Sequence, residues 1–253
     1  MIFYLMKNKH LFKTNIMKKL IYIFLTVLIV GCSGEDNNNN NQSSCNGDNP
    51  VYLADNGVTI KACEWALIGD AGNINGFTYT VVSEQQLRDY INNGSSDLDR
   101  FVTTQVVNMY NMGAAEANWD VSNVTDMSYL LYNKAGANND ISNWDVSNVT
   151  DMEGMFYGAY FDQNISSWDV SNVTTMQSMF SGCGFNQPIG DWDVSNVTNM
   201  AKMFSTEGSS GARSFDQDLS GWNVFNVINC SGFKDGIGSW TQPKPFFTNC
   251  NPN

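Results

Sequence analysis

The sequence predicts an α/β repeat solenoid in which every coil holds one short strand and one short helix. Trp-Asp-Val recurs at Trp119, Trp144, Trp168 and Trp192, with spacings of 25, 24 and 24 residues. A fifth copy, Trp222-Asn223-Val224, follows after 30 residues, and the gap before it holds an insertion at Thr206–Arg213. A unit of this length cannot bury its apolar face alone, so we expect the copies to stack.

The strand is predicted around each tryptophan. Trp144 and Val146 lie two residues apart, so they share one face of an extended segment. The helix is predicted directly afterwards, because Val149, Met152 and Phe156 have the spacing of one or two helical turns. Thr150 and Glu153, and likewise Thr174 and Gln177, have the spacing of a capping box.

Residues 1–31 are predicted to be a secretory signal peptide, with Met17 as the expected start. Two lysines precede an apolar run over 20–30, which is shorter than the roughly twenty residues needed to cross a bilayer. Ile29-Val30-Gly31-Cys32 resembles the lipobox of bacterial lipoproteins, which implies that Cys32 is acylated. An uncleaved N-terminal anchor is the alternative, and the short run disfavours it.

Residues 32–44 are expected to form a lipidated, asparagine-rich tether. Glu35 and Asp36 lie directly behind the lipidated position and resemble an export signal of some Gram-negative bacteria. That resemblance implies a lipid-anchored protein of the outer membrane that faces the cell exterior. The acids otherwise belong to a solvated tether.

The charge of the chain excludes several partners and chemistries. Of its 13 basic residues, five precede Cys32, so eight remain against 25 acidic ones, and the mature chain carries a net charge of −17. So acidic a chain repels nucleic acids and anionic membrane surfaces, which leaves membrane contact through the N-terminal lipid alone. The only histidine, His10, lies in the signal peptide, so catalysis or zinc binding through imidazole is not expected.

Two caps are expected to cover the ends of the repeat region, which we place at residues 101–230. Residues 45–100 form an N-terminal α+β cap, with apolar β-rich runs at 58–60 and 77–82 and a helix over 87–91. Ser83 and Gln86 have capping-box spacing before that helix. Residues 231–253 form the C-terminal cap.

Five cysteines remain in the exported chain, so at least one thiol is unpaired. Disulfides Cys45–Cys63 and Cys230–Cys250 would each staple a cap and leave Cys183 alone in a repeat loop. Sequence does not fix this connectivity. No cysteine pair has the close spacing of a zinc or redox motif, and we expect no metal and no cofactor.

The candidate binding surface consists of two columns of polar residues that point outward from the predicted strands. A column of aspartates and a column of serines would run across the coils, with neighbouring carboxylates about 4.8 Å apart. The columns comprise Asp120, Asp145, Asp169 and Asp193, and Ser122, Ser147, Ser171 and Ser195. Repulsion between carboxylates favours a site for a cation, a basic protein patch or sugar hydroxyls. The alternative is that each aspartate accepts hydrogen bonds from its own turn and serves the fold.

The phrase Trp-Asp-Val-Ser-Asn-Val-Thr-x-Met occurs four times, and over residues 102–233 the chain resembles the BspA-like bacterial surface proteins. Their repeats are often grouped with leucine-rich repeats, so the resemblance implies leucine-rich-repeat-like coils. It also implies a non-catalytic role in adhesion or host binding, with a host or matrix protein or a polysaccharide as partner. A structural stalk without a ligand is the alternative. We expect no enzyme, because any aspartate ladder meets the carboxylate spacing of a glycosidase trivially.

Overall fold

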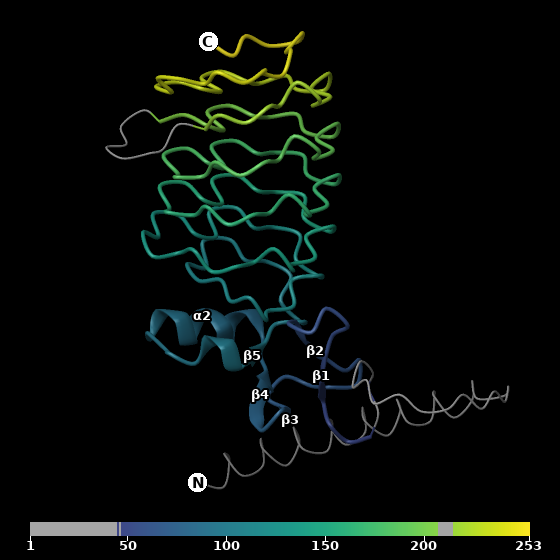
Figure 1. Ribbon diagram of the computed structural model, residues 1–253. Helices are drawn as coiled ribbons and strands as arrows, with labels where there is room; N and C mark the ends of the chain where they lie inside the picture. The colour runs from purple at the N-terminus through teal and green to yellow at the C-terminus, as the bar shows by residue number, and fades with distance from the viewer. Residues whose placement is uncertain (1–44, 46, 207–214) are drawn as a thin grey trace, which may run out of the picture.

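The computed structural model describes residues 45, 47–206 and 215–253 of the 253-residue chain. It consists of a small N-terminal module and a tall stack of coils, which Figure 1 shows in blue and in teal to yellow. The chain passes from the module into the stack after strand β5 and ends at the far end of the stack (Figure 1). The predicted signal peptide, the tether with Cys32 and most of the Thr206–Arg213 insertion lie outside the described residues.

Five short strands build the N-terminal module in two sheets. One sheet pairs two strands antiparallel, and the other runs in the order β3-β4-β5, with β4 and β5 parallel. The strands are β1 Val51–Leu53, β2 Ile60–Ala62, β3 Ala71–Ile74, β4 Phe77–Val81 and β5 Phe101–Val102. Asn75 and Gly76 both have positive φ, as the tight turn between two antiparallel strands requires.

Helix α2, Glu84–Asn92, closes this module against the stack. The side chain of Ser83 accepts a hydrogen bond from the Gln86 amide while Gln86 bonds back, so the predicted capping box forms. Leu87 is the buried residue of the helix and packs into the core of the stack. The single-turn helix η1, Leu98–Arg100, then leads into β5.

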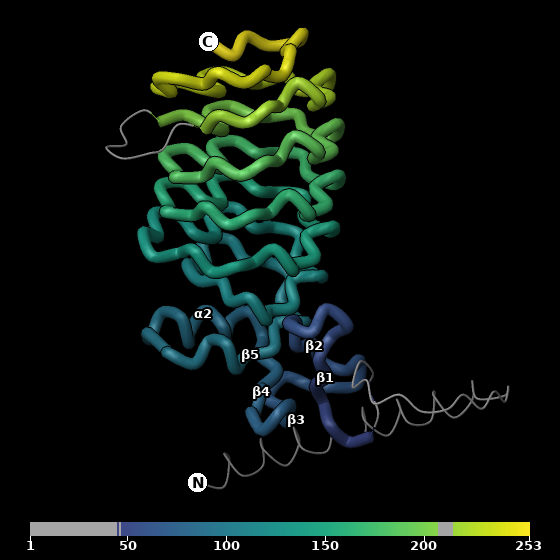
Figure 2. Tube along the Cα trace, viewed as in Figure 1, coloured from purple at the N-terminus to yellow at the C-terminus, as the bar shows by residue number. Residues whose placement is uncertain are grey.

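The stack contains neither an α-helix nor a strand in its described residues, 103–206 and 215–253. Each coil is a series of tight turns, and the coils lie on one another like the layers in Figure 2. One position per coil forms an isolated parallel bridge to the next coil. The bridges run through Asn108, Asp126, Asp151, Thr175, Asn199 and Asn229. The predicted α/β repeat solenoid of leucine-rich-repeat-like coils, each with a strand and a helix, is therefore wrong.

Backbone conformation explains the missing helix. Gly154 and Ser178 occupy equivalent positions in the middle of two predicted helices, and their φ values are +56° and +54°. A right-handed helix requires negative φ, so the chain cannot continue through these residues as a helix. The predicted capping residue Thr174 instead donates its hydroxyl to Thr150 O in the previous coil, at 3.0 Å.

A turn at each aspartate explains the missing strand. The Ser147 amide donates to Asp145 Oδ1 at 3.2 Å, and the Val149 amide then donates to Val146 O at 2.9 Å. These turns bend the backbone before an extended ladder can form. Trp144 and Val146 nevertheless both bury their side chains, so the predicted inward face exists without a strand.

Columns of stacked rings fill the core. The tryptophans lie in register, and Trp144 and Trp168 are nearly parallel with centroids 6.5 Å apart. At one corner of each later coil, two phenylalanines stack on each other at 4.1–4.2 Å. These pairs are Phe156–Phe161, Phe180–Phe185 and Phe204–Phe215. Aromatic pairs of this geometry contribute about 0.5–1.5 kcal/mol beyond burial, so the columns stabilise the contact between coils.

Side chains and backbone amides form hydrogen bonds to opposite neighbouring coils. Side-chain donors reach the previous coil: Asn172 Nδ2 binds Ser147 O at 2.7 Å, and Trp168 Nε1 binds Ile141 O at 3.2 Å. Backbone amides at the opposite edge donate to the following coil, as Met152 does to Thr175 O. The asparagine bond recurs from Asn123, Asn148, Asn196 and Asn226.

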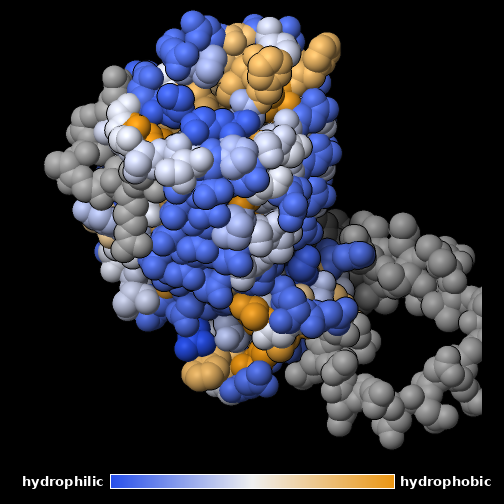
Figure 3. Space-filling model, turned by 45° about the horizontal axis from the view of Figure 1, so that its top comes forward, coloured by the Kyte–Doolittle hydropathy of each residue, from blue (hydrophilic) through white to orange (hydrophobic). Residues whose placement is uncertain are grey.

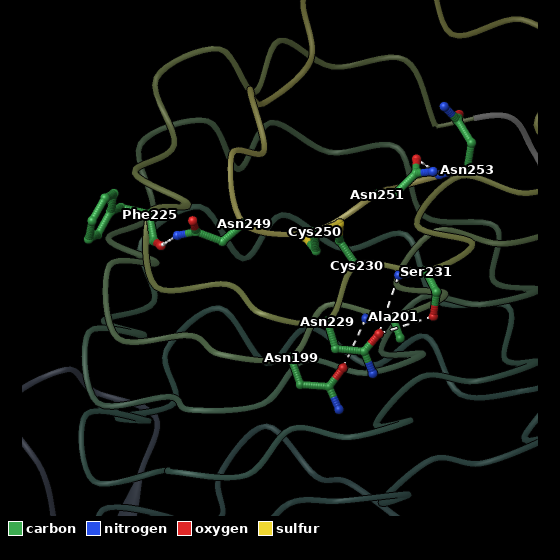
Figure 4. The surroundings of a disulfide bond; sticks show 10 residues. All are labelled: Asn199, Ala201, Phe225, Asn229, Cys230, Ser231, Asn249, Cys250, Asn251 and Asn253. Atoms are coloured by element: carbon green, nitrogen blue, oxygen red, sulfur yellow. Dashed lines mark hydrogen bonds between the residues drawn. A yellow bond between two sulfur atoms is a disulfide. The ribbon is translucent and has the colours of Figure 1, made fainter.

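Both predicted disulfides form, and each lies in a terminal part of the described chain. Cys45 pairs with Cys63, and Cys230 pairs with Cys250. Figure 4 shows the second bond beside Asn249, whose Nδ2 donates to Phe225 O and so repeats the asparagine bond of the coils. Cys183 is a buried free thiol.

Candidate functional site

The predicted aspartate and serine columns are built from one repeated hydrogen-bonded turn. In the coils of Asp145 and Asp169, the serine two residues later donates both its amide and its hydroxyl to aspartate Oδ1. The hydroxyl bonds are 2.6 Å long in both coils. At Asp193 the amide of Ser195 donates at 3.0 Å. These contacts are those of an Asx turn, the structural alternative for this column.

The turn favours the charged form of Asp169 and Asp193. The Ser171 hydroxyl and then the Ser171 amide lower the pKa of Asp169, against small opposing effects of burial and of Asp193. Ser195 lowers the pKa of Asp193 in the same way. Both aspartates are exposed, so the column is an anionic stripe whose Oδ1 atoms already serve the turns.

Asp120, the first residue of the predicted column, is not on this surface. Its side chain is only 2% exposed, because the N-terminal module covers this end of the stack. Lys61 of β2 forms an ion pair with Asp120 Oδ1 at 3.4 Å, and Ser122 donates its hydroxyl to the same oxygen. Asp120 and Ser122 therefore join the module to the stack instead of facing a partner.

A second surface, which the sequence analysis missed, consists of four tyrosines at the N-terminal end of the stack. We call Tyr110, Tyr129, Tyr132 and Tyr157 the tyrosine patch. The first three rings meet edge to face at 6.1 and 5.7 Å, and Tyr132 stacks on Tyr157 at 5.1 Å. Tyr110 and Tyr132 are 50% and 40% exposed. The patch is an ordered aromatic surface.

Helix α2 and a glutamate hold the patch in place. Arg88 of α2 donates Nη1 to Tyr110 O at 2.8 Å, which fixes the first tyrosine to the N-terminal module. The Tyr129 hydroxyl donates to Glu153 Oε1, and Gln177 Nε2 donates to the same oxygen at 2.9 Å. The bond to Glu153, followed by burial, raises the pKa of Tyr129, so this hydroxyl stays protonated.

Carboxylates lie close to the patch. Burial is the main cause that raises the pKa of Asp151, and the negative charges of Asp126 and Glu153 raise it further. In the described residues, no group of three acidic, cysteine or histidine side chains has a geometry that could hold a metal ion. The patch therefore combines aromatic rings with negative charge.

The sequence signal for the patch is a departure from the repeat. Bridges and backbone bonds align Tyr132 and Tyr157 with Ser181 and Ser205 of later coils, and Tyr129 with Gly154 and Ser178. The fold thus accepts small residues at these positions. Because architecture does not require tyrosine there, the two-coil run of tyrosines needs another explanation.

A pocket of about 300 Å³ opens beside the patch, between the loops 113–116 and 133–139. Leu131, Ala115 and Ile141 contribute its apolar lining. Glu116 and Lys134 are its two charged lining residues. Burial, and then the charge of Asp99, raises the pKa of Glu116.

The far end of the stack carries a different exposed group. Figure 3 shows a largely hydrophilic face over the coils, with hydrophobic residues at the C-terminal end and a second group at the opposite end. Phe225, Ile228 and Phe246 are the large apolar residues exposed in this part of the chain. Phe225 and Ile228 stand where the earlier repeats have serine and threonine. No helix of the described residues is long and apolar enough to span a membrane.

Comparison with known families identifies the repeated unit. The model of a family described as "Mycoplasma protein of unknown function, DUF285" matches residues 84–181, 115–207 and 161–243. Together these matches span 84–243, more than half of the chain. The chain belongs to the DUF285 family. No curated protein and no solved structure matches it.

The three DUF285 matches overlap, and two of them start at different coils of the stack, at residues 115 and 161, as expected when a family model spans several copies of a repeat. They include the tyrosine patch and the lining of the pocket. The family description names no activity, so function is inferred from these surfaces alone.

Proposed function

We propose that this DUF285 protein is a surface-anchored, non-catalytic binding protein that contacts its partner through the tyrosine patch. The observation that carries this proposal is the row of contacting rings at Tyr110, Tyr129, Tyr132 and Tyr157, of which Tyr110 and Tyr132 are exposed. Later coils have serine at the positions of Tyr132 and Tyr157. Tyrosine supplies a large contact area with few rotatable bonds and is enriched in protein interfaces.

The chemistry around the patch favours a protein segment that carries lysine or arginine. The carboxylates Asp126, Asp151 and Glu153 lie near the rings, and the mature chain carries a net charge of −17 as counted above. Ammonium and guanidinium groups bind both to carboxylates and to the faces of aromatic rings. Such a partner would lose affinity as salt screens these charges.

The proposed cell-surface location rests on the sequence around Cys32, which resembles a lipobox. Acylation of this cysteine would leave a tether of about a dozen residues before the N-terminal module, enough to hold the stack away from the membrane. Replacement of Cys32 by Ala is expected to release the protein from the membrane fraction. An unchanged membrane fraction would exclude lipid anchoring at Cys32.

The binding experiment compares two triple variants in surface plasmon resonance against an array of lysine- and arginine-rich peptides. Tyr132→Ser and Tyr157→Ser copy the residues of later coils, and Tyr110→Ser completes the first variant. The matched control, Asp145→Asn with Asp169→Asn and Asp193→Asn, changes the exposed part of the aspartate column instead. We expect the tyrosine variant to lose at least tenfold in affinity and the control to retain it.

Three results would contradict the proposal. Equal affinity of the tyrosine variant and the wild type would exclude the patch, provided that both have the same circular dichroism spectrum. Loss of affinity in the aspartate control alone would favour the anionic stripe. Binding to polysaccharides and to no peptide would exclude a basic protein partner.

A structural stalk without a partner is the second candidate. The Asx turns favour it, because the most regular polar residues of the chain bond within their own coils. In that case both triple variants would change only the stability of the protein, and no peptide would bind to the wild type.

A further inference from the structure

The pocket beside the tyrosine patch exists because the columns of stacked phenylalanines begin at Phe156 and Phe161 and do not extend into the coil before them. In the later coils, two stacked rings fill this corner, as Phe156 and Phe161 do with centroids 4.2 Å apart. Backbone bonds place Leu131 one coil before Phe156, and the bond from the Asp162 amide to Asn138 places Ala137 one coil before Phe161. Leucine and alanine thus stand where the next coil has two rings.

The first coil does not fill the space either. The Gly113 amide donates to Leu130 O, which aligns Gly113 with Leu131. The chain then continues through Ala114 and Ala115, which also line the pocket. At the other end of the stack, by contrast, Trp240 and Phe233 close the columns by meeting the ring of Phe204 edge to face.

The pocket has the right size for the missing ring. Its volume of about 300 Å³ lies at the lower end of the range for small-molecule sites. An apolar cavity of about 150 Å³ is enough to bind benzene. A ring inserted here would continue the column of Phe156 and Phe161.

The two charged residues that line the pocket indicate which charged groups the ligand carries in addition to its ring. Glu116 is half-buried, and no ion pair of its carboxylate is found in the described part of the chain. Its Oε2 accepts a bond from Asn139 Nδ2 at 3.1 Å. An uncompensated carboxylate in a partly buried position attracts an ammonium group.

Lys134 supplies the opposite charge. Its side chain lies against Gly113, where an added Cβ would come within 2.9 Å of Nζ. Gly113 has a φ of +82° and no side chain, so the lysine ammonium reaches across the loop to the pocket. A ligand carboxylate is the natural partner of this group.

We propose that the pocket binds a free aromatic amino acid, with its ring in the gap of the phenylalanine columns, its ammonium at Glu116 and its carboxylate at Lys134. This site is separate from the macromolecular contact proposed for the tyrosine patch. Its test uses other variants, so either proposal can fail without the other.

Isothermal titration calorimetry of the full chain with L-phenylalanine tests the site. Three further probes each lack one feature: L-leucine lacks the ring, phenethylamine lacks the carboxylate, and 3-phenylpropionate lacks the ammonium. We expect L-phenylalanine to bind at least tenfold more tightly than each of them. No heat of binding up to about 10 mM L-phenylalanine would overturn the proposal. Equal binding of all probes would overturn the assignment of both charges.

Filling the pocket provides the decisive variant. Ala137→Phe introduces the residue that the next coil has as Phe161, and Leu131→Phe does the same for Phe156. Each is expected to abolish binding while the protein stays folded, and two variants protect against failure of one to fold. Glu116→Gln and Lys134→Gln should each weaken binding at least tenfold, and Asp145→Asn is the control that should not. Retained binding in a folded Ala137→Phe variant would place the ligand elsewhere.

Discussion

The indole Nε1 of Trp168 donates to the carbonyl oxygen of Ile141, 3.2 Å away in the previous coil. Trp144, Trp192 and Trp222 make the same kind of bond to the previous coil, and Trp119 makes it to Leu98 O of η1. Each of these tryptophans therefore both fills the core and donates to a carbonyl group of the neighbouring layer. The indole thus links packing within a coil to hydrogen bonding between coils.

Trp168→Phe tests this dual role. The phenylalanine ring keeps most of the apolar burial but removes one of the two donors to the Ile141 carbonyl, which still accepts from the Trp144 amide at 3.1 Å. One hydrogen bond contributes a net stabilisation of about 0.5–1.5 kcal/mol, so we expect the free energy of unfolding to fall by about that amount. Urea denaturation measures it, with the exposed Tyr160→Phe as a control. Equal stability of the variant and the wild type would show that the bond contributes nothing.

The left-handed turn positions make opposite predictions for two residues. Gly154→Ala adds a Cβ at φ +56° and within 2.6 Å of the Tyr129 ring, so we expect a loss of about 1–2 kcal/mol or more. Ser178→Gly removes a Cβ at φ +54° and should gain about 1 kcal/mol. Thermal unfolding of both variants checks the two signs. A stabilised Gly154→Ala would contradict the left-handed conformation.

The Asx turns predict how acid acts on the exposed column. Ser171→Ala removes the hydroxyl that is the main cause of the lowered pKa of Asp169, so this pKa should rise toward its ordinary value of about 3.9. A carboxyl group with a lowered folded pKa stabilises the protein above its unfolded pKa, and the effect is lost as pH falls through the folded pKa. The wild type should therefore be more stable than the variant at neutral pH, and this difference should disappear in acid. Carbon-detected NMR titration of Asp169 measures the shift, with Asp193 as the unchanged reference.

Cys183 should resist modification in the folded protein. Burial raises the pKa of this thiol to about 11, while hydrogen bonds from the backbone partly oppose the effect. At pH 8 the reactive thiolate is then about a hundredfold rarer than for a thiol with a pKa of 9. Iodoacetamide should label Cys183 slowly at pH 8 and rapidly in urea, as mass spectrometry can follow. Rapid labelling without denaturant would contradict the burial.

Sequence periodicity identified which residues face inward but not the backbone path between them. The burial of Trp144 and Val146 and the helix after Ser83 follow from spacing and local chemistry. The two cysteine pairs are those that the sequence suggested without fixing them. The helix predicted after Val149 is wrong, because apolar residues three apart fit successive turns as well as a helix. The left-handed conformation of Ser178 leaves no mark in the residue type, since serine rarely adopts it.

The candidate site was missed for a related reason. Columns of identical residues consist of side chains that every repeat shares. Shared residues such as Asp169 and Ser171 form the hydrogen bonds that hold the turn of their own coil. The tyrosine patch and the pocket lie where the repeat is broken, at Tyr132 and Ala137 for example. Such departures carry no signal until the coils are aligned in space.

The repeated hydrogen bonds between coils have a consequence for how this protein changes over generations. Each coil offers the same carbonyl groups to the coil after it and the same side-chain donors to the coil before it. A duplicated stretch of 24 residues therefore meets fitting partners on both sides, and a deleted stretch leaves two fitting surfaces to rejoin. Duplication and deletion can thus change the number of coils without disturbing the contacts between them. The two ends of the stack, with the pocket near one and the Cys230–Cys250 disulfide at the other, stay the same.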